Sequence, residues 1–238
     1  NHNTASGYQA MLLNSTGSRN SAFGRTTLRG NTTGCCNTAM GMYSMYSNTT
    51  ASNNTAYGYS SLFANTTGTA NTASGMYSLY NNTSGGYNTA TGMFSLCANT
   101  TGGGNTASGY ASLKNNTTGQ LNAAFGHNSM RSITTGSNNT ASGYQSLYSN
   151  VIGGGNTATG TCSLHSNIVD NNTAYGACSL QKNTTGELNT AVGTCSMRCN
   201  TVGRRNAAFA YMSLHNNTTG CGNSALGYMS LVLNTTGI

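Results

Sequence analysis

Apolar and small residues recur along this chain at fixed intervals instead of gathering in blocks. Counted from an asparagine, the repeat reads N-T-A-x-G-x-x-S-L-x-x-N-T-T-G-x-x, and its ninth place is Leu or Met in all fourteen copies. Every step is 17 residues long except the one from Asn156 to Asn172, which is 16. A unit this short cannot bury a core alone, so successive units must stack. The pattern predicts an all-β fold, a parallel β-solenoid (β-roll) of fourteen 17-residue coils, with residues 1–238 forming a single repeat array.

The ninth place is the predicted hydrophobic spine, because it stays apolar and large in every copy. Alanine at the third place is expected to keep the coil thin, since a larger residue would collide with the opposite wall. The spine includes Leu62, Leu79, Leu96, Leu113, Leu147, Leu164, Leu180 and Leu214.

Asparagine opens every copy and also stands at the twelfth place in thirteen of the fourteen, with Ile133 as the exception. Asparagines at coil corners are expected to stack their side-chain amides and to satisfy the polar groups of buried turns. The predicted ladder at the first place includes Asn54, Asn71, Asn88, Asn105, Asn139, Asn156, Asn172 and Asn189.

Enrichment in Thr, Tyr, Val and Ile with glycine punctuation favours strands and tight turns. We expect strands at places two to four and six to ten, and a shorter one at places thirteen and fourteen. Glycines at places five and fifteen are expected to supply bends with positive φ. The residue missing before Asn172 is expected in the turn near Asp170, because its loss from a strand would reverse every downstream face. Leu164 and Leu180 should therefore still stack in register.

Two further places report on the surface. The tenth place varies widely, which is typical of a position facing solvent, so a change such as Gln181→Asp should be mild. The sixth place is rich in Tyr and Met, for example Tyr59 and Met76. Such a stripe either packs against another subunit or stacks between rungs of one solenoid.

Charge limits the partners of the chain. Charged residues make up 5% of the sequence, and the net charge of +7 is spread along it, with only Arg204 and Arg205 adjacent. No dense stripe for nucleic acid is present, and weak attraction to anionic glycans or membranes is the most that this charge predicts. No apolar run reaches the roughly 18 residues that span a bilayer.

Catalytic chemistry is not indicated. The carboxylates are Asp170 and Glu187, and among four histidines only His165 and His215 share a place, three coils apart. Without a converging acid, base or nucleophile we predict no enzyme activity, no catalytic residues, no metal site and no cofactor.

Cysteines form one column. Cys162, Cys178 and Cys195 share the seventh place in three successive coils. Rungs about 4.8 Å apart lie within the Cα range of a disulfide, so one pair is a candidate bridge. Cys199 is an alternative partner for the third thiol, and three unpaired small residues are the other interpretation.

Threonine columns raise the alternative of ice binding. Thr at places two, thirteen and fourteen forms regular arrays, but adjacent residues of a strand point to opposite faces. The pair also becomes Val151-Ile152 and Ile168-Val169, which indicates partial burial. Strand propensity is the simpler explanation of the threonines.

The motif N-T-A-x-G-x-x-S-L followed by N-T-T-G covers the whole chain and resembles repeats of phage tail-fibre-like and large bacterial or viral surface proteins. More distantly, Ala124-Phe125-Gly126 with Ser129 is similar to the head repeat of trimeric autotransporter adhesins. That resemblance implies a left-handed parallel β-roll that assembles as a homotrimer.

The sequence thus predicts a structural fibre or filament protein, located outside the cell, on the cell surface or on a virion. The expected partner is a second copy, stacked end to end or in a trimer, within a longer fibre of which this chain is a segment or subunit. The principal alternative is a trimeric adhesin or tail-fibre module that binds glycans or a cell-surface receptor, and an ice-binding solenoid is a minor one. A receptor-binding module should carry a patch that breaks the repeat, whereas a fibre should be uniform.

Overall fold

The structure is a computed structural model that describes residues 2–237. The chain divides into two compact units, Asn1–Leu121 and Asn122–Ile238. We number the coils in chain order, so that coil 1 contains β1 and coil 14 contains β14, and we count places within a coil from its leading asparagine. The first unit holds β1 (Thr4–Ser6), β2 (Ser21–Phe23), β3 (Thr38–Met40), β4 (Thr55–Tyr57), β5 (Thr72–Ser74), β6 (Thr89–Thr91) and β7 (Thr106–Ser108). The second unit holds β8 (Ala123–Phe125), β9 (Thr140–Ser142), β10 (Thr157–Thr159), β11 (Thr173–Tyr175), β12 (Thr190–Val192), β13 (Ala207–Phe209) and β14 (Ser224–Leu226).

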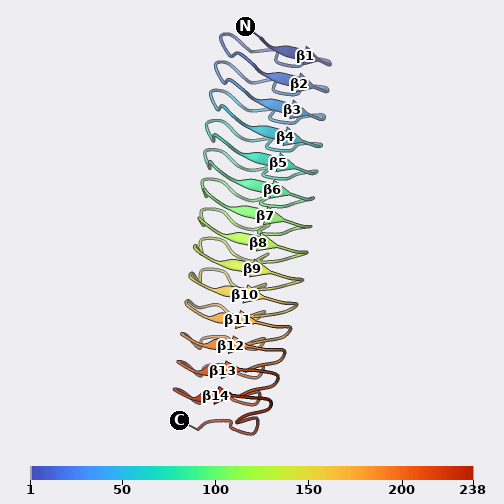
Figure 1. Ribbon diagram of the computed structural model, residues 1–238. Helices are drawn as coiled ribbons and strands as arrows, with labels where there is room; N and C mark the ends of the chain where they lie inside the picture. The colour runs from blue at the N-terminus through green and yellow to red at the C-terminus, as the bar shows by residue number, and fades with distance from the viewer. Residues whose placement is uncertain (1, 238) are drawn as a thin grey trace. The chain divides into compact units, whose positions relative to one another are not determined.

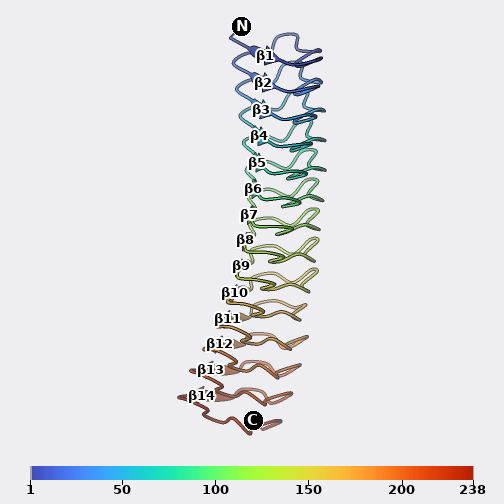
Figure 2. The same ribbon diagram turned by 90° about the vertical axis from the view of Figure 1, so that its right-hand side faces the viewer.

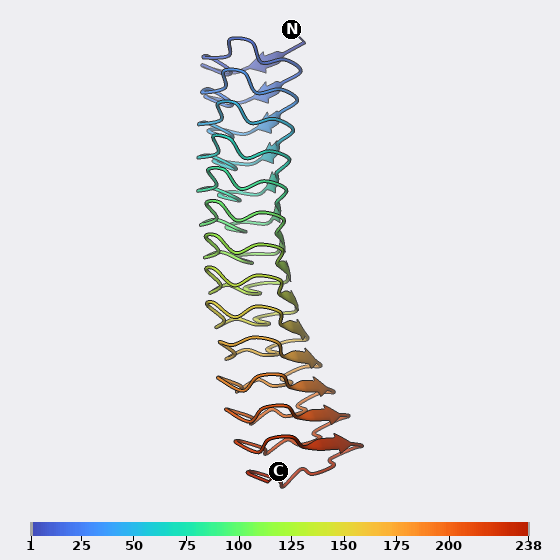
Figure 3. The same cartoon turned by 90° about the vertical axis from the view of Figure 1, so that its left-hand side faces the viewer.

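Within each unit the strands pair in parallel and in chain order, from β1 to β7 and from β8 to β14 (Figure 1). The third-place alanines face one another in this register, as Ala56 pairs with Ala73 and Ala174 with Ala191. In each unit the strands lie above one another along one wall, and the rest of every coil folds back from it (Figures 2 and 3). The protein is an all-β parallel β-solenoid, as predicted, and residues 2–237 contain no helix.

Only the first of the three predicted strands is present. Places six to eleven are turns, and places thirteen and fourteen are a bend. Positive φ alternates through the turns: in coil 6 it is 116° at Gly92, 60° at Phe94 and 48° at Leu96. The expected strand at places six to ten was therefore wrong, although rung-to-rung bonds continue through it, as Leu96 N–H donates to Ser112 O at 3.1 Å.

Glycine occurs at places five and fifteen for different structural reasons. Glycine at place five does adopt positive φ, as predicted, and Gly75 does so at 131°. Glycine at place fifteen does not, so that part of the prediction was wrong. It is favoured because the chains approach closely there: a Cβ on Gly68 would lie 2.6 Å from Asn65 Oδ1 and 2.9 Å from Asn82 Nδ2. Coil 3 nevertheless accommodates Ala51 at this place. Besides places five, seven and nine, the seventeenth place also has positive φ, which was not anticipated; it is 61° at Tyr87 and 58° at Leu188.

The 16-residue coil keeps its register. Ala158 pairs with Ala174 across the short step, and Leu164 N–H donates to Ser179 O at 3.0 Å. The lost residue comes from the bend, because Val169 supplies the carbonyl that the fifteenth-place residue supplies elsewhere, accepting from Asn156 Nδ2 at 2.8 Å. The expectation that the turn near Asp170 absorbs the deletion is confirmed.

Candidate functional site

The features that set this chain apart are columns of identical side chains, and the leading asparagine is the most continuous of them. Asn71 donates its backbone N–H to Asn54 Oδ1 at 2.9 Å, and Asn88 does the same to Asn71 at 3.0 Å. In the second unit Asn156 and Asn172 repeat the bond at 3.0 and 2.9 Å. The predicted ladder residues, each at most 1% exposed, are Asn54, Asn71, Asn88, Asn105, Asn139, Asn156, Asn172 and Asn189.

A second asparagine column, at the twelfth place, meets the first at one carbonyl. In coil 5, Gly85 O accepts from Nδ2 of Asn71 and from Nδ2 of Asn82, both at 2.9 Å. Asn82 Nδ2 also donates to Asn65 Oδ1 of the previous coil at 2.8 Å. The two side-chain amides therefore bond to one carbonyl of their own coil, and each also bonds to an asparagine of a neighbouring coil. These bonds satisfy the buried polar groups, which would otherwise lose their hydrogen bonds to water without replacement.

One coil lacks this second amide. Ile133 stands at the twelfth place of coil 8 and is fully buried. In coil 9, Asn150 bonds only within its own coil, donating to Gly153 O at 2.8 Å and accepting from Gly153 N–H at 2.9 Å. The isoleucine therefore replaces one rung of the amide column by an apolar contact.

The interior between the corners is narrow. Alanine at the third place and serine at the eighth are buried, and the eighth-place hydroxyls bond to backbone carbonyls, as Ser78 Oγ does to Gly75 O at 2.9 Å. This serine column was not singled out from the sequence, although its constancy was visible there. The spine residues, all 0% exposed, are Leu62, Leu79, Leu96, Leu113, Leu147, Leu164, Leu180 and Leu214.

Aromatic rings line the outer turns of the first unit. At the tenth place Tyr46, Phe63 and Tyr80 stack in sequence, with ring centroids 5.2 and 5.1 Å apart. The tenth place is therefore half-buried rather than freely solvated, which corrects the expectation for it. At the sixth place Tyr59 meets the ring of Tyr77 edge-on at 5.5 Å and still exposes 38% of its surface, so that stripe both stacks and faces solvent.

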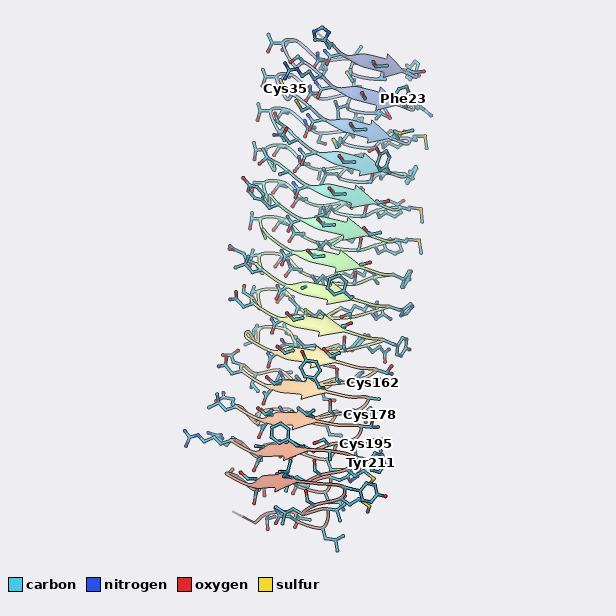
Figure 4. All side chains as sticks on the ribbon, in the orientation of Figure 1. Phe23, Cys35, Cys162, Cys178, Cys195 and Tyr211 are labelled. Atoms are coloured by element: carbon cyan, nitrogen blue, oxygen red, sulfur yellow. The ribbon has the colours of Figure 1, made fainter. Side chains whose placement is uncertain are left out.

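The seventh place carries thiols in the second unit. Cys162, Cys178 and Cys195 follow one another on successive coils (Figure 4). All three are free and half-buried. Burial raises the pKa of Cys162 and of Cys195, and the neighbouring Cys178 adds to both shifts. The raised pKa makes Cys162 and Cys195 weaker nucleophiles than an ordinary thiol, and a bridge within the column stays a prediction.

Cysteine also occurs at the sixteenth place, where it accepts hydrogen bonds. Cys35 Sγ accepts from Ser18 Oγ at 3.6 Å and from Ser18 N–H at 3.4 Å, and these two bonds lower the pKa of the Cys35 thiol. The equivalent backbone N–H of coil 9, that of Gly154, donates to Asp170 Oδ1 of coil 10 at 2.7 Å. Asp170 thus caps a turn, and no group of three metal-ligating side chains occurs within residues 2–237.

The threonine columns differ in what their hydroxyls do. At the thirteenth place they bond to the next coil, as Thr66 Oγ1 does to Thr83 O at 3.0 Å. At the fourteenth place they lie exposed. Val151, Ile152 and Ile168 are 41%, 68% and 43% exposed, so the partial burial inferred from the two apolar pairs was wrong for these three and holds only for Val169, which is half-buried. The bend tolerates apolar residues because its cohesion comes from the backbone.

Comparison with family models, with curated proteins and with solved structures finds no match to this chain. Within the described residues no helix has the length and apolar character to cross a membrane.

Proposed function

We propose that this protein is a structural element of a fibre or filament, located outside the cell, on the cell surface or on a virion. The observation that carries the proposal is that each coil presents to the next the same bonds that it accepts from the one before. Such a stack can grow indefinitely, because every added coil presents the same hydrogen-bonding groups as the coil to which it has bound.

An uncovered coil is an adhesive surface. Leu231, the ninth-place residue of coil 14, is 48% exposed, whereas Leu214 in coil 13 is fully buried. Leu226 on β14 is 83% exposed. Coils pair through apolar side chains and backbone groups that are the same on every rung, and this identity of the rungs makes a second copy the proposed partner.

The test is assembly of the purified chain, followed by negative-stain electron microscopy and fibre diffraction. We expect filaments with an axial repeat of about 4.8 Å. Leu231→Lys should suppress them by placing a charge on the contacting coil. Leu233→Lys is the matched control, because Leu233 is already 81% exposed at the eleventh place of the same coil. Monodisperse particles at high concentration, or filaments indifferent to Leu231→Lys, would contradict the proposal.

A second candidate, a module that binds glycans or a receptor, is favoured by one local feature of the first unit. Tyr87 and Leu121, both exposed at the variable seventeenth place, border a hollow of the surface.

A further inference from the structure

The seventeenth place adopts positive φ, a conformation that suits glycine and asparagine. Those two residues occupy it in six of the thirteen coils that contain it. Coils 5 and 7 instead carry Tyr87 at 61° and Leu121 at 55°, which are 76% and 62% exposed. Among the described residues Tyr87 has no ring partner, unlike the stacked tyrosines of the tenth place. Positive φ is common to this place, since Leu188 and Arg205 adopt 58° there in the second unit. What sets coils 5 and 7 apart is that an exposed tyrosine and an exposed leucine border the same hollow, with a glycine between them.

Tyr87 and Leu121 flank a notch of about 530 Å³ in the first unit. They stand two rungs apart, or about 10 Å at the usual spacing. Between them the coil-6 residue is Gly104, and Gly86 and Gly103 complete the floor. Leu121 leans over this floor, because a Cβ on Gly104 would lie 2.9 Å from Leu121 Cδ2. The volume falls in the range of small-ligand sites.

Hydroxyl groups border the notch. Thr67, Ser84 and Thr101, all at the fourteenth place, line it and are exposed. The adjacent thirteenth-place hydroxyls are committed to the fold, as Thr83 Oγ1 donates to Thr100 O at 3.1 Å. The fourteenth-place hydroxyls therefore face outward where a ligand would lie, and Thr69 and Gln120 complete the polar border of the notch.

No charged residue lines this notch. An exposed aromatic ring, a leucine and a row of hydroxyls match a molecule that has one C–H face and a rim of hydroxyls, and they offer nothing to a charged one. We propose that the notch between Tyr87 and Leu121 binds a neutral pyranose sugar, with a C–H face of the sugar on the Tyr87 ring. The site is independent of assembly into a fibre.

The second unit provides an internal comparison. The same places in coils 8 to 10 enclose about 420 Å³ around Gly154 and Gly155. There the walls are Asn138 and Asn171, and Asp170 replaces a neutral residue at the sixteenth place. This second notch has no aromatic platform and carries a carboxylate, so it should not hold the sugar.

The experiment is saturation-transfer-difference NMR on the full 238-residue chain, with methyl α-mannopyranoside, methyl β-glucopyranoside and methyl β-galactopyranoside as probes. N-acetylneuraminic acid is the charged comparison. We expect at least one neutral glycoside to receive saturation on one C–H face, and Tyr87→Phe to keep its affinity within about 3-fold. Tyr87→Asn should weaken binding at least 10-fold while folding normally, because asparagine suits positive φ.

Gly103→Thr is a second variant that should abolish binding by filling the floor, and Thr69 at the same place in coil 4 shows that the fold accepts it. Tyr175→Asn is the matched control, because Tyr175 on β11 is 48% exposed and remote in sequence from the notch. Absence of transfer to all three neutral glycosides, preference for the acidic sugar, or unchanged binding by Tyr87→Asn and Gly103→Thr would overturn the proposal. Filaments are imaged in parallel, and their presence or absence in these variants reports on the fibre proposal alone.

Discussion

The inward and outward columns of this solenoid follow opposite rules. Inward places one, three, eight and nine repeat nearly the same residue in every coil and are buried. Outward places ten and seventeen hold Arg, Tyr, Cys, Gly and Leu in turn. The difference does not separate polar from apolar residues, since asparagine and serine lie inside while leucine and tyrosine lie outside. Inward side chains must contact the equivalent residue of the next coil, whereas outward side chains need not.

The consequence is that burial in this fold is a matter of partners more than of hydrophobicity. A buried asparagine costs little when the coil above and the coil below offer the matching amide. Outward residues also meet neighbours of their own column, and there unlike side chains find contacts, as Arg198 Nε donates to Gln181 Oε1 at 2.9 Å at the tenth place. The comparison can be tested by changing one column at a time.

The largest effect is expected at the spine. Leu113→Asp buries an unpaired charge where the side chain is 0% exposed, and it should destabilise the unit by more than about 4 kcal/mol. Gln181→Asp, at the outward tenth place beside Arg198, should change stability by less than about 0.5 kcal/mol. Urea unfolding followed by circular dichroism measures both. Equal losses would erase the distinction between the two regions.

The asparagine ladder should come next. Asn88 Oδ1 accepts from Asn105 N–H at 2.9 Å, and its Nδ2 donates to Gly102 O at 2.9 Å. Asn88→Ala leaves that N–H buried without an acceptor, and we expect a loss of about 2–3 kcal/mol. Asn81→Ala, at an exposed place one coil earlier, should be nearly neutral. Hydrogen exchange at the Asn105 amide should rise only in the first variant, and protection there in both would contradict the role of the ladder.

A gain is expected at the one irregular fifth place. Ala210 adopts a φ of 103° where the other thirteen coils have glycine. Ala210→Gly should raise stability by about 1 kcal/mol by relieving this strain. Gly92→Ala is the reverse change, and its Cβ would lie 2.8 Å from Gly109 O, so it should lower the melting temperature. Calorimetry that finds Ala210→Gly destabilising would show that the alanine is favoured there.

The smallest effect is a dependence on pH from the outward tenth place. His165 stacks on Tyr148 with ring centroids 5.2 Å apart, and its burial lowers its pKa. The unfolded chain then binds the proton at higher pH than the folded one, so stability falls as pH drops through about 6.5. Because His165 is only half-buried, we expect a shift of about 1 °C between pH 7.5 and 5. His165→Gln should remove this shift, and a shift that persists in the variant would assign it to another group.

The sequence predicted the inward columns well, because a residue that bonds to its own copy must recur at a fixed interval. Asn88, Leu96 and Ala90 could be placed from spacing alone. It predicted the backbone between them poorly. Places six to ten are rich in Tyr, Phe and Leu, which favour strands, yet Phe94 and Leu96 have positive φ.

The reason is physical. When two coils have the same conformation and stack in register, their backbones can exchange hydrogen bonds in almost any shape that repeats, extended or not. The aromatic residues are there for rings that stack from coil to coil, as Tyr77 does with Phe94 at 5.5 Å. The aromatic residues at these places therefore indicated contacts between coils correctly, but the strand conformation that they also predicted is absent. The notch at Tyr87 escaped notice for a related reason: a bulky residue at the seventeenth place stands out only once that place is known to need positive φ.

The asparagine columns have a direction. Every side-chain amide bond between coils runs the same way, with Nδ2 donating toward the amino-terminal neighbour, as Asn48 donates to Asn31 at 2.8 Å and Asn200 to Asn183 at 2.7 Å. The two faces of any coil are therefore unlike, with amide donors on one and amide oxygens on the other. Two like faces leave these side-chain amides without a matching partner, so head-to-tail joining is the arrangement that continues the asparagine columns. A filament built from such coils is polar, and its two tips grow on chemically different surfaces.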